Sequence, residues 1–257
     1  HQVVQMATVV AAYQRFREAS TYVMPRMDLS HGANFLYMLR GREPEEYEGR
    51  IMDASLVLHA EHEFNASTFT ARVVASTLST CYCSISAAMG ALFGSLHGGA
   101  NQRVLEMVEE IGSPDRVAQW MDKATANKQK VPGMGHREYK VKDPRSYVME
   151  DFLVELSEKK KDHRYYDILK EIERQFRLKM EEKGKPLYPN VDFFSGAVYR
   201  LLGIPPLLFT PIFAMARVSG WLAHILEQRE RGNRIYRPES LYKGPTERSY
   251  VPLSARS

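Results

Sequence analysis

A few histidines, one aspartate and several arginines, each in a distinctive short setting, could carry chemistry in this chain. Imidazoles exchange protons near neutral pH, a carboxylate can act as a base, and guanidinium groups bind carboxylates through paired hydrogen bonds. Such a set suits carbon–carbon bond formation on a multiply charged carboxylic acid. The residues are His62, His97, His136, Asp192, Arg145, Arg217 and Arg237.

Arg217 lies in a strongly apolar stretch between Ile212 and Trp221. A guanidinium in such surroundings is costly unless an anion compensates its charge. That anion could be a core carboxylate, in an internal ion pair, or a substrate carboxylate, and the sequence leaves both open. Arg145 and Arg237 lie in less apolar settings and, taken alone, are typical of surface residues.

Asp192 stands between Val191 and two consecutive phenylalanines. Desolvation in an apolar site raises the pKa of a carboxyl group and makes it a better base. The same residue could instead cap a helix that begins at Phe193. The sequence therefore gives Asp192 either a catalytic or a structural role.

Glycines adjoin two of the histidines. His97 precedes Gly98 and Gly99, and His136 follows the run Gly-Met-Gly at 133–135. Glycine lets another molecule approach the backbone closely, although a single Gly-x-Gly turn is weak evidence for a nucleotide site. The sequence contains neither GxxxxGK[ST] nor GxGxxG, so it does not indicate use of ATP or a dinucleotide.

His59 and His62, with Glu61 and Glu63 beside them, could hold a metal ion from one face of a helix. The zinc-protease pattern HExxH is absent, since His62 and Glu63 are followed by FNA. A metal-dependent hydrolase is therefore an alternative from a different class of function.

The bulk composition is that of a globular protein with a substantial core. The chain has 257 residues, of which 44% are hydrophobic and 26% charged, and its net charge is +4. This charge suits anionic small molecules and is too small and scattered to indicate nucleic-acid binding.

Residues 73–102 contain no Asp, Glu, Lys or Arg. Their length could span a bilayer, but their many Ser, Thr, Gly and Ala residues favour a tightly packed helix pair inside the protein or at a subunit interface. Cys81 and Cys83 in this stretch are expected to be buried, inert thiols. No signal peptide is visible, and we expect a cytoplasmic location.

Periodicity predicts a mainly α-helical protein, because helical spacings are common and period-two alternation is rare. One helix should contain Ile168, Ile172 and Phe176 and end near Gly184. Gly203 and Gly232 should follow the ends of two others. Three helices should begin where a capping residue precedes proline: Ser113-Pro114, Asp143-Pro144 and Thr210-Pro211.

Charge divides the chain into segments. Residues 106–185 are rich in charged side chains, whereas residues 66–100 and 204–226 are apolar. This pattern predicts a smaller, solvated helical domain inserted into a more buried one. His97 and Asp192 then lie near the ends of the insert, where an enzyme that closes over its substrate could bring them together.

Six motifs in order resemble the citrate synthase family, nearest the bacterial and archaeal type and close also to 2-methylcitrate synthase. The resemblance covers essentially the whole chain, although family members carry a further segment ahead of the equivalent of His1. The motifs are HAEHEFNASTF, LHGGAN, PGMGHREYKVKDPR, NVDFFSG, ARVSGWLAHILEQ and RPESLYKGP.

The resemblance implies an all-α, two-domain fold, with a large domain at 1–98 and 204–257 and a small domain at 99–203. It also implies a homodimer formed through large-domain helices, with residues 73–96 in the interface, and some relatives assemble into hexamers. No metal, other cofactor, nucleic-acid partner or membrane is implied, and acetyl-CoA enters as a substrate.

The resemblance also implies a role for each residue. Asp192 would take a proton from acetyl-CoA, His97 would hydrogen-bond to the thioester oxygen, and His136 would polarise and protonate the ketone of oxaloacetate. The residues that would hold oxaloacetate are His62, Arg145, Arg217 and Arg237, the last reaching in from the partner subunit. The loop that would receive the adenine part of CoA consists of Val131, Pro132, Gly133, Met134 and Gly135.

The implied reaction is condensation of acetyl-CoA with oxaloacetate, followed by hydrolysis of citryl-CoA to citrate and CoA. Two alternatives stay open within the family. A 2-methylcitrate synthase would use propionyl-CoA, which is larger by one methylene, and a non-catalytic subunit would keep only the fold.

Overall fold

Helices make up nearly all the regular structure of the computed structural model, which describes residues 1–94 and 96–256. Within those residues the only β-type pairing is an isolated antiparallel bridge between Met134 and Pro189. The predicted all-α fold class is confirmed. The helices are α1 (Gln2–Arg17), α2 (His31–Arg40), α3 (Glu46–Ala60), α4 (Ala66–Ser76), α5 (Cys81–Phe93), α6 (Ala100–Ile111), α7 (Val117–Ala126), α8 (Pro144–Lys160), α9 (Arg164–Glu181), α10 (Asp192–Leu201) and α11 (Phe209–Glu230), with 3₁₀ turns η1 (Pro114–Arg116), η2 (Pro206–Leu208) and η3 (Leu253–Ala255).

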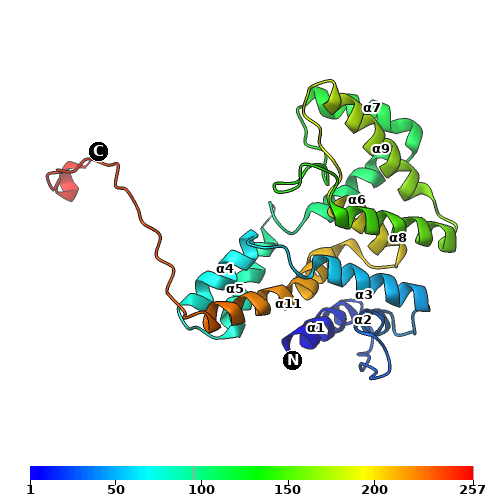
Figure 1. Ribbon diagram of the computed structural model, residues 1–257, viewed down its shortest axis with the longest axis horizontal. Helices are drawn as coiled ribbons and strands as arrows, with labels where there is room; N and C mark the ends of the chain where they lie inside the picture. Colours follow the sequence, from blue (N-terminus) through cyan, green and yellow to red (C-terminus); the bar gives the residue numbers. More distant parts are fainter. Residues whose placement is uncertain (95, 257) are drawn as a thin grey trace.

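The helices pack in two groups (Figure 1). In the first group α1 contacts α2, α2 contacts α3 and α4 contacts α5, and α11 joins them through α1, α3, α4 and α5, whereas α6 to α10 contact mainly each other. The groups meet where α3 touches α8 and where α6 touches α11 and η2. One hydrophobic cluster includes residues from both groups, such as Leu36 and Leu153. Part of the hydrophobic core is therefore common to both groups. The domain limits, with the small domain at 99–203, stay a prediction.

Helix α11 runs through the first group and contacts α1, α3, α4 and α5. Together with the preceding turn, at Pro206–Glu230, it is long and apolar enough to cross a membrane. Its apolar side chains instead pack in the protein, and Trp221 and Ile225 are completely buried. Among the described residues it is the one such helix, and it serves here as a core helix that also carries Arg217.

The three predicted helix starts have different outcomes. Asp143 caps α8, and its carboxylate accepts from the backbone N–H of Arg145. Ser113 precedes only the short turn η1, and its side chain makes no capping bond. The third start is wrong, because the turn η2 leads directly into α11, which begins before Thr210. The Thr210 hydroxyl donates instead to the carbonyl of Gly98, 2.9 Å away.

The predicted helix ends lie close to the observed ones. Gly184, Gly203 and Gly232 all have positive φ and follow α9, α10 and α11 by two or three residues. A positive φ is readily adopted only by glycine, so these residues turn the chain away from each helix.

The expectation of buried thiols is wrong. Cys81 is half-buried and Cys83 is exposed. The reason is that α5 buries one face, through Ile85, Ala88 and Leu92, against α4 and α11, and Cys83 lies off that face. The interface proposed for residues 73–96 stays a prediction, and large apolar side chains in that stretch, including Tyr82 and Phe93, are exposed.

Candidate active site

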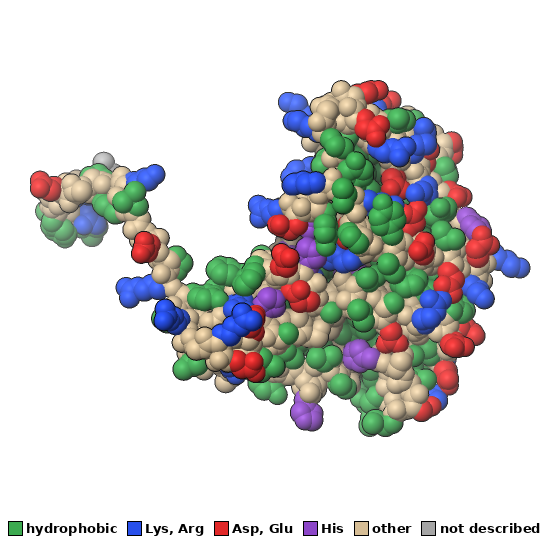
Figure 2. All heavy atoms as spheres, viewed as in Figure 1, with side chains coloured by type: hydrophobic (Ala, Val, Ile, Leu, Met, Phe, Trp, Pro, Cys, Tyr) green, Lys and Arg blue, Asp and Glu red, His purple; other side chains and the backbone are tan. Residues whose placement is uncertain are grey.

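A cleft of about 820 Å³ brings together most of the predicted site residues. Its lining comes from both groups of helices, and Figure 2 shows histidine and charged side chains where the upper and lower helices adjoin. Six of the seven residues that could carry chemistry line it, namely His62, His97, His136, Arg145, Asp192 and Arg217.

Loops and helix starts present these side chains. His62 lies in the loop between α3 and α4, and His97 in the loop between α5 and α6. His136 lies in the long segment before α8, Asp192 is the first residue of α10, and Arg217 lies within α11. The loop at His97 depends on Gly98, since a side chain there would clash with the carbonyl of Leu92.

The hydrogen bonds around His97 fix its tautomer. Its Nε2 accepts from the backbone N–H of Ser67 at 3.3 Å and lies 2.9 Å from the Ser67 hydroxyl. The Ser67 hydroxyl donates to Asn65 Oδ1 at 2.8 Å and accepts from Trp221 Nε1 at 3.2 Å, so the backbone N–H of Ser67 is the donor that makes His97 Nε2 an acceptor. Burial, helped by the charge of Arg217, lowers the pKa of His97. A neutral His97 therefore carries its proton on Nδ1.

His136 has the opposite arrangement. Its Nδ1 accepts from the backbone N–H groups of Glu138 and Tyr139, at 3.1 and 3.2 Å. Burial lowers the pKa of His136 as well, so the neutral ring carries its proton on Nε2. The two histidines can each donate one hydrogen bond to a ligand without being charged.

His62 lies beside His136, with ring centroids 5.1 Å apart. Its Nε2 is 3.1 Å from the hydroxyl of Tyr139. Burial lowers the pKa of His62, and the charges of Arg145 and Arg217 lower it further. All three histidines of the cleft are thus held toward the neutral form.

His59 does not join His62 in a shared site. It is buried in α3, its Nδ1 lies 2.8 Å from the Ser55 carbonyl, and its ring contacts Phe213 edge-on. Burial lowers its pKa to about 4. Among residues 1–94 and 96–256, no group of three or more His, Cys, Asp or Glu is placed to hold a metal ion. This geometry does not support the metal-dependent alternative.

Arg217 is only 2% exposed. Its Nε donates to the carbonyl of His59 at 2.8 Å, and its guanidinium lies over the ring of Phe213. No carboxylate of the described chain forms an ion pair with it, so the core ion pair considered from the sequence is absent. Burial lowers its pKa to about 10, and it stays charged at neutral pH. Its charge is left for a ligand in the cleft.

Arg145 is held by a buried carboxylate. Asp143 accepts from Nε of Arg145 at 3.0 Å and from Nη2 at 2.7 Å, and it also accepts from the backbone N–H of Val191 at 3.2 Å. Burial alone would raise the pKa of Asp143, but the bonds to Arg145 outweigh it and hold the pKa low. A guanidinium has five N–H donors, so Arg145 keeps others for a ligand.

Asp192 is the first residue of α10 rather than its cap, which is Val191. Its backbone N–H donates to the side chain of Asn190 at 3.0 Å. Burial raises the pKa of Asp192 to about 6, against the lowering effect of Arg145 and with the help of Asp143. The alternative of a helix cap is therefore wrong, and the group titrates near neutral pH.

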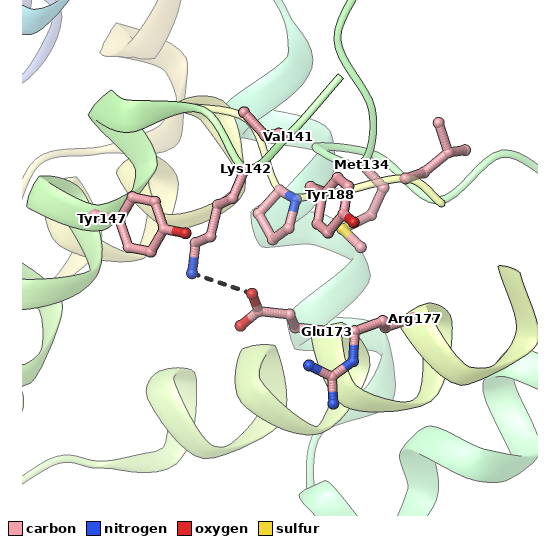
Figure 3. A pocket seen from close by; sticks show the side chains of 9 residues that line it. Met134, Val141, Lys142, Tyr147, Glu173, Arg177 and Tyr188 are labelled. Atoms are coloured by element: carbon pink, nitrogen blue, oxygen red, sulfur yellow. Dashed lines mark hydrogen bonds and ion pairs between the residues drawn. The ribbon is translucent and has the colours of Figure 1, made fainter. Parts of the chain in front are cut away.

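Two sets of predicted residues do not line the cleft. Arg237 is exposed on the C-terminal segment, which extends away from the helices beyond α11 (Figure 1). The loop at 131–135 turns with positive φ at Gly133 and Gly135. Met134 lines a neighbouring cavity of about 340 Å³, with Tyr188 and others (Figure 3).

Comparison with known proteins decides the family. Residues 2–239 match the model of the family described as citrate synthase, C-terminal domain. The chain belongs to the citrate synthase family. The six motifs that suggested this family are thus correctly interpreted.

Two relatives show the range of names among citrate synthase family members similar to this chain. "Citrate synthase" of Synechocystis sp. is 49% identical over 252 residues, which cover 98% of this chain and 63% of the relative. "Citrate/2-methylcitrate synthase" of Bacillus subtilis is 43% identical over 242 residues, which cover 94% of this chain and 63% of the relative. The chain spans 63% of the length of either relative.

Two solved structures of the citrate synthase family share this fold. Citrate synthase from Pyrobaculum aerophilum has a TM-score of 0.89 and 46% identity, covering 98% of this chain and 62% of that one. Citrate synthase from Thermoplasma acidophilum, described as a ternary complex with carboxymethyl coenzyme A and oxaloacetate, has a TM-score of 0.91 and 36% identity, covering 99% and 68%.

Sequence reasoning missed the residues that orient the predicted ones. Ser67 and Trp221 fix His97, Tyr139 contacts His62, and Asp143 holds Arg145 although it was assigned only as a cap. Ser67 and Trp221 lie within motifs of the citrate synthase family, but their bond joins α4 to α11. No spacing rule within a single segment could have revealed it.

The tautomers of the two histidines can be measured directly. In nitrogen NMR of the protein with isotope-labelled histidine, neutral His97 should carry its proton on Nδ1 and neutral His136 on Nε2, because each opposite nitrogen accepts a backbone N–H. Ser67→Ala keeps the backbone N–H that donates to His97, so both tautomers should stay unchanged in that variant. A proton found on Nε2 of His97 would contradict the arrangement.

Proposed function

We propose that the protein condenses acetyl-CoA with oxaloacetate and hydrolyses the resulting citryl-CoA to citrate and CoA. The observation that carries this proposal is the buried, unpaired charge of Arg217 in a cleft that also holds Asp192, His97 and His136. The cleft thus combines an anion site, a base of raised pKa and two neutral donors.

The first chemical problem is removal of a proton from the methyl group of a thioester. That group is a weaker acid than a carboxylic acid by more than ~10 pKa units, which corresponds to well over ~14 kcal/mol. The raised pKa of Asp192 recovers only about 3 kcal/mol of this difference. The base alone is insufficient, and the developing charge on the thioester oxygen must be stabilised.

His97 is suited to that stabilisation. Its Nδ1–H is free of the bonds that hold Nε2, so it can donate to the thioester oxygen as the enol or enolate forms. A donor held in advance in a water-poor site lowers such a barrier by several kcal/mol. The neutral state matters because the ring then serves as a hydrogen-bond donor and leaves proton removal to Asp192.

Oxaloacetate would bind in the same cleft, beside the acyl group. Arg217 and Arg145 would hold its carboxylates, with His62 beside them. Nε2–H of His136 would polarise the ketone and pass its proton to the alkoxide when the new carbon–carbon bond forms. Water then cleaves the thioester of citryl-CoA, which gives citrate and free CoA thiol.

Three parts of this proposal involve residues outside the cleft or a second subunit. Arg237 would contribute to oxaloacetate binding in a partner subunit, so activity would require a homodimer. Residues 131–135 would receive the adenine part of CoA. Support comes from the positive φ of Gly133 and Gly135, which shapes a tight turn there, and from the exposed position of Arg237.

The relatives support the substrates and leave the acyl group open. The similar Thermoplasma acidophilum structure is described with oxaloacetate and a CoA analogue. The Bacillus subtilis relative named "Citrate/2-methylcitrate synthase" favours propionyl-CoA as a second candidate donor. One methylene changes the transition-state energy by only ~1–3 kcal/mol, so kcat/KM for both acyl-CoAs must be compared.

Release of CoA thiol tests the proposed reaction. The protein should release thiol only when acetyl-CoA and oxaloacetate are both present. Asp192→Asn removes the base while keeping the shape of the side chain, and turnover should fall by at least ~100-fold with oxaloacetate binding retained. No release by the folded, assembled wild type would favour the non-catalytic subunit. Near-normal turnover of the variant would refute the role of Asp192.

The pH dependence of kcat/KM reports the base. Because Asp192 must be deprotonated and its pKa in the free protein is raised to about 6, kcat/KM for acetyl-CoA should rise as pH increases, with its limb at or above that value when oxaloacetate is bound, and level off at higher pH. Asp192→Glu should move the rising limb, whereas limbs due to His97 or His136 would stay in place. If the rising limb stays in place in Asp192→Glu, it belongs to a histidine and not to Asp192.

Arg217→Ala tests the anion site. Loss of bonds from a charged donor should weaken oxaloacetate binding by ~10- to 150-fold. Calorimetric binding of CoA should change by less than about threefold, since CoA is expected to bind elsewhere. Arg174→Ala, on the exposed surface of α9, is the matched control and should alter neither affinity. Equal losses for both ligands would indicate a structural role for Arg217.

A further inference from the structure

A second buried arginine lies outside the proposed reaction. Arg72 on α4 is 9% exposed. Its guanidinium donates to Glu227 Oε2 at 3.0 Å, Gln228 Oε1 at 2.8 Å and the hydroxyl of Tyr236 at 3.1 Å. It also donates to the carbonyl of His224 at 3.3 Å. These five residues are the Arg72 cluster, and they join α4, α11 and the start of the C-terminal segment.

Tyr236 is firmly held in this cluster. Its hydroxyl donates to Gln228 Oε1 at 2.6 Å, and its backbone N–H donates to the hydroxyl of Ser76 at 3.1 Å. Its ring stacks on Phe69, with an angle of 17° between the planes. By contrast, every residue at 237–256 is exposed, and Figure 1 shows this segment extending away from the helices. Tyr236 is therefore the last anchored residue before the free segment.

The other side of the cluster touches the cleft. The guanidinium of Arg72 lies 5.1 Å from the ring centroid of Phe64, which lines the cleft. His224 Nε2 is 2.9 Å from Glu61 Oε1. Glu61 and Phe64 belong to the loop that carries His62. The guanidinium of Arg72 thus contacts both the loop that carries His62 and Tyr236 at the start of the C-terminal segment.

We propose that Arg72 and Tyr236 are positioning residues that fix where Arg237 is presented. This inference rests on the proposed function, in which Arg237 binds oxaloacetate in a partner subunit. Adjacent Cα atoms are about 3.8 Å apart, so an anchored Tyr236 confines the start of Arg237 closely. Without it, the last anchored residue is Asn233, whose side chain donates to Ser76 O at 2.7 Å.

The loss of one anchor has a definite geometric consequence. Four flexible residues from Asn233 to Arg237 have a root-mean-square span of ~10–12 Å. Arg237 would then sample a much larger volume, and its effective concentration at the partner's cleft would fall. The consequence is weaker oxaloacetate binding with the chemistry of the cleft intact.

Tyr236→Phe in the purified protein tests this inference. The variant keeps the stack on Phe69 and the backbone bond to Ser76, and it removes the hydroxyl from Arg72 and Gln228, so the anchor is loosened rather than lost. KM for oxaloacetate should rise about tenfold, while kcat and KM for acetyl-CoA change by less than about twofold. Tyr22→Phe, an exposed tyrosine between α1 and α2, is the matched control and should change none of these values. A fall in kcat with KM for oxaloacetate unchanged would overturn the proposal.

A double-mutant cycle separates positioning from general damage. If Tyr236 acts through Arg237, adding Tyr236→Phe to Arg237→Ala should change KM for oxaloacetate by less than about twofold. If the two effects multiply, Tyr236 acts by another route and the proposal fails. Arg72→Leu should show the same dependence on Arg237, provided that circular dichroism shows it to be folded.

Hydrogen exchange tests the anchor independently of activity. The amide of Tyr236, which donates to the Ser76 hydroxyl, should exchange at least about tenfold faster in Tyr236→Phe than in wild type, while the amides of α4 stay unchanged. Unchanged exchange of the Tyr236 amide would overturn the anchoring role. A wild type that releases no thiol, with this exchange effect present, would refute the proposed function and leave the anchor standing.

Discussion

The buried positive charge of Arg217 is the constraint on which the rest of the site depends. A guanidinium placed among apolar side chains needs compensation, and the described chain provides a carbonyl and an aromatic face but no carboxylate. Arg145 is arranged differently, since Asp143 neutralises it in part and aims it. Of the two arginines, Arg217 therefore keeps a charge that no carboxylate of the described chain neutralises, and under the proposed function a carboxylate of oxaloacetate would do so.

Burial and the same charge both act on the pKa values of the histidines. Burial is the main cause of their lowered pKa values, and the field of the arginines works in the same direction at His62 and His97. Neutral rings have one donor and one acceptor, and backbone N–H groups occupy the acceptor at His97 and at His136. The fold thus turns two ordinary imidazoles into donors of fixed direction, without a separate charged partner for either.

The sequence allowed the fold class and most of the cleft to be predicted, because each motif carries its own local signal. The Asp143 cap is local, and so are the glycines beyond α9 and α10. What failed depended on packing between segments. Cys83 is exposed because only one face of α5 is covered, and the start of α11 was misplaced because the preceding turn runs straight into it.

Under the proposed function, the electrostatics of the cleft also favour an order of events. In the free protein burial raises the pKa of Asp192 and Arg145 opposes that rise. A bound oxaloacetate dianion would neutralise the arginines and add negative charge nearby, and both changes would raise the proton affinity of Asp192 further. The base would therefore be strongest only after the acceptor is in place. An acyl-CoA that arrived first would meet a weaker base, so enolisation without an acceptor would be slow.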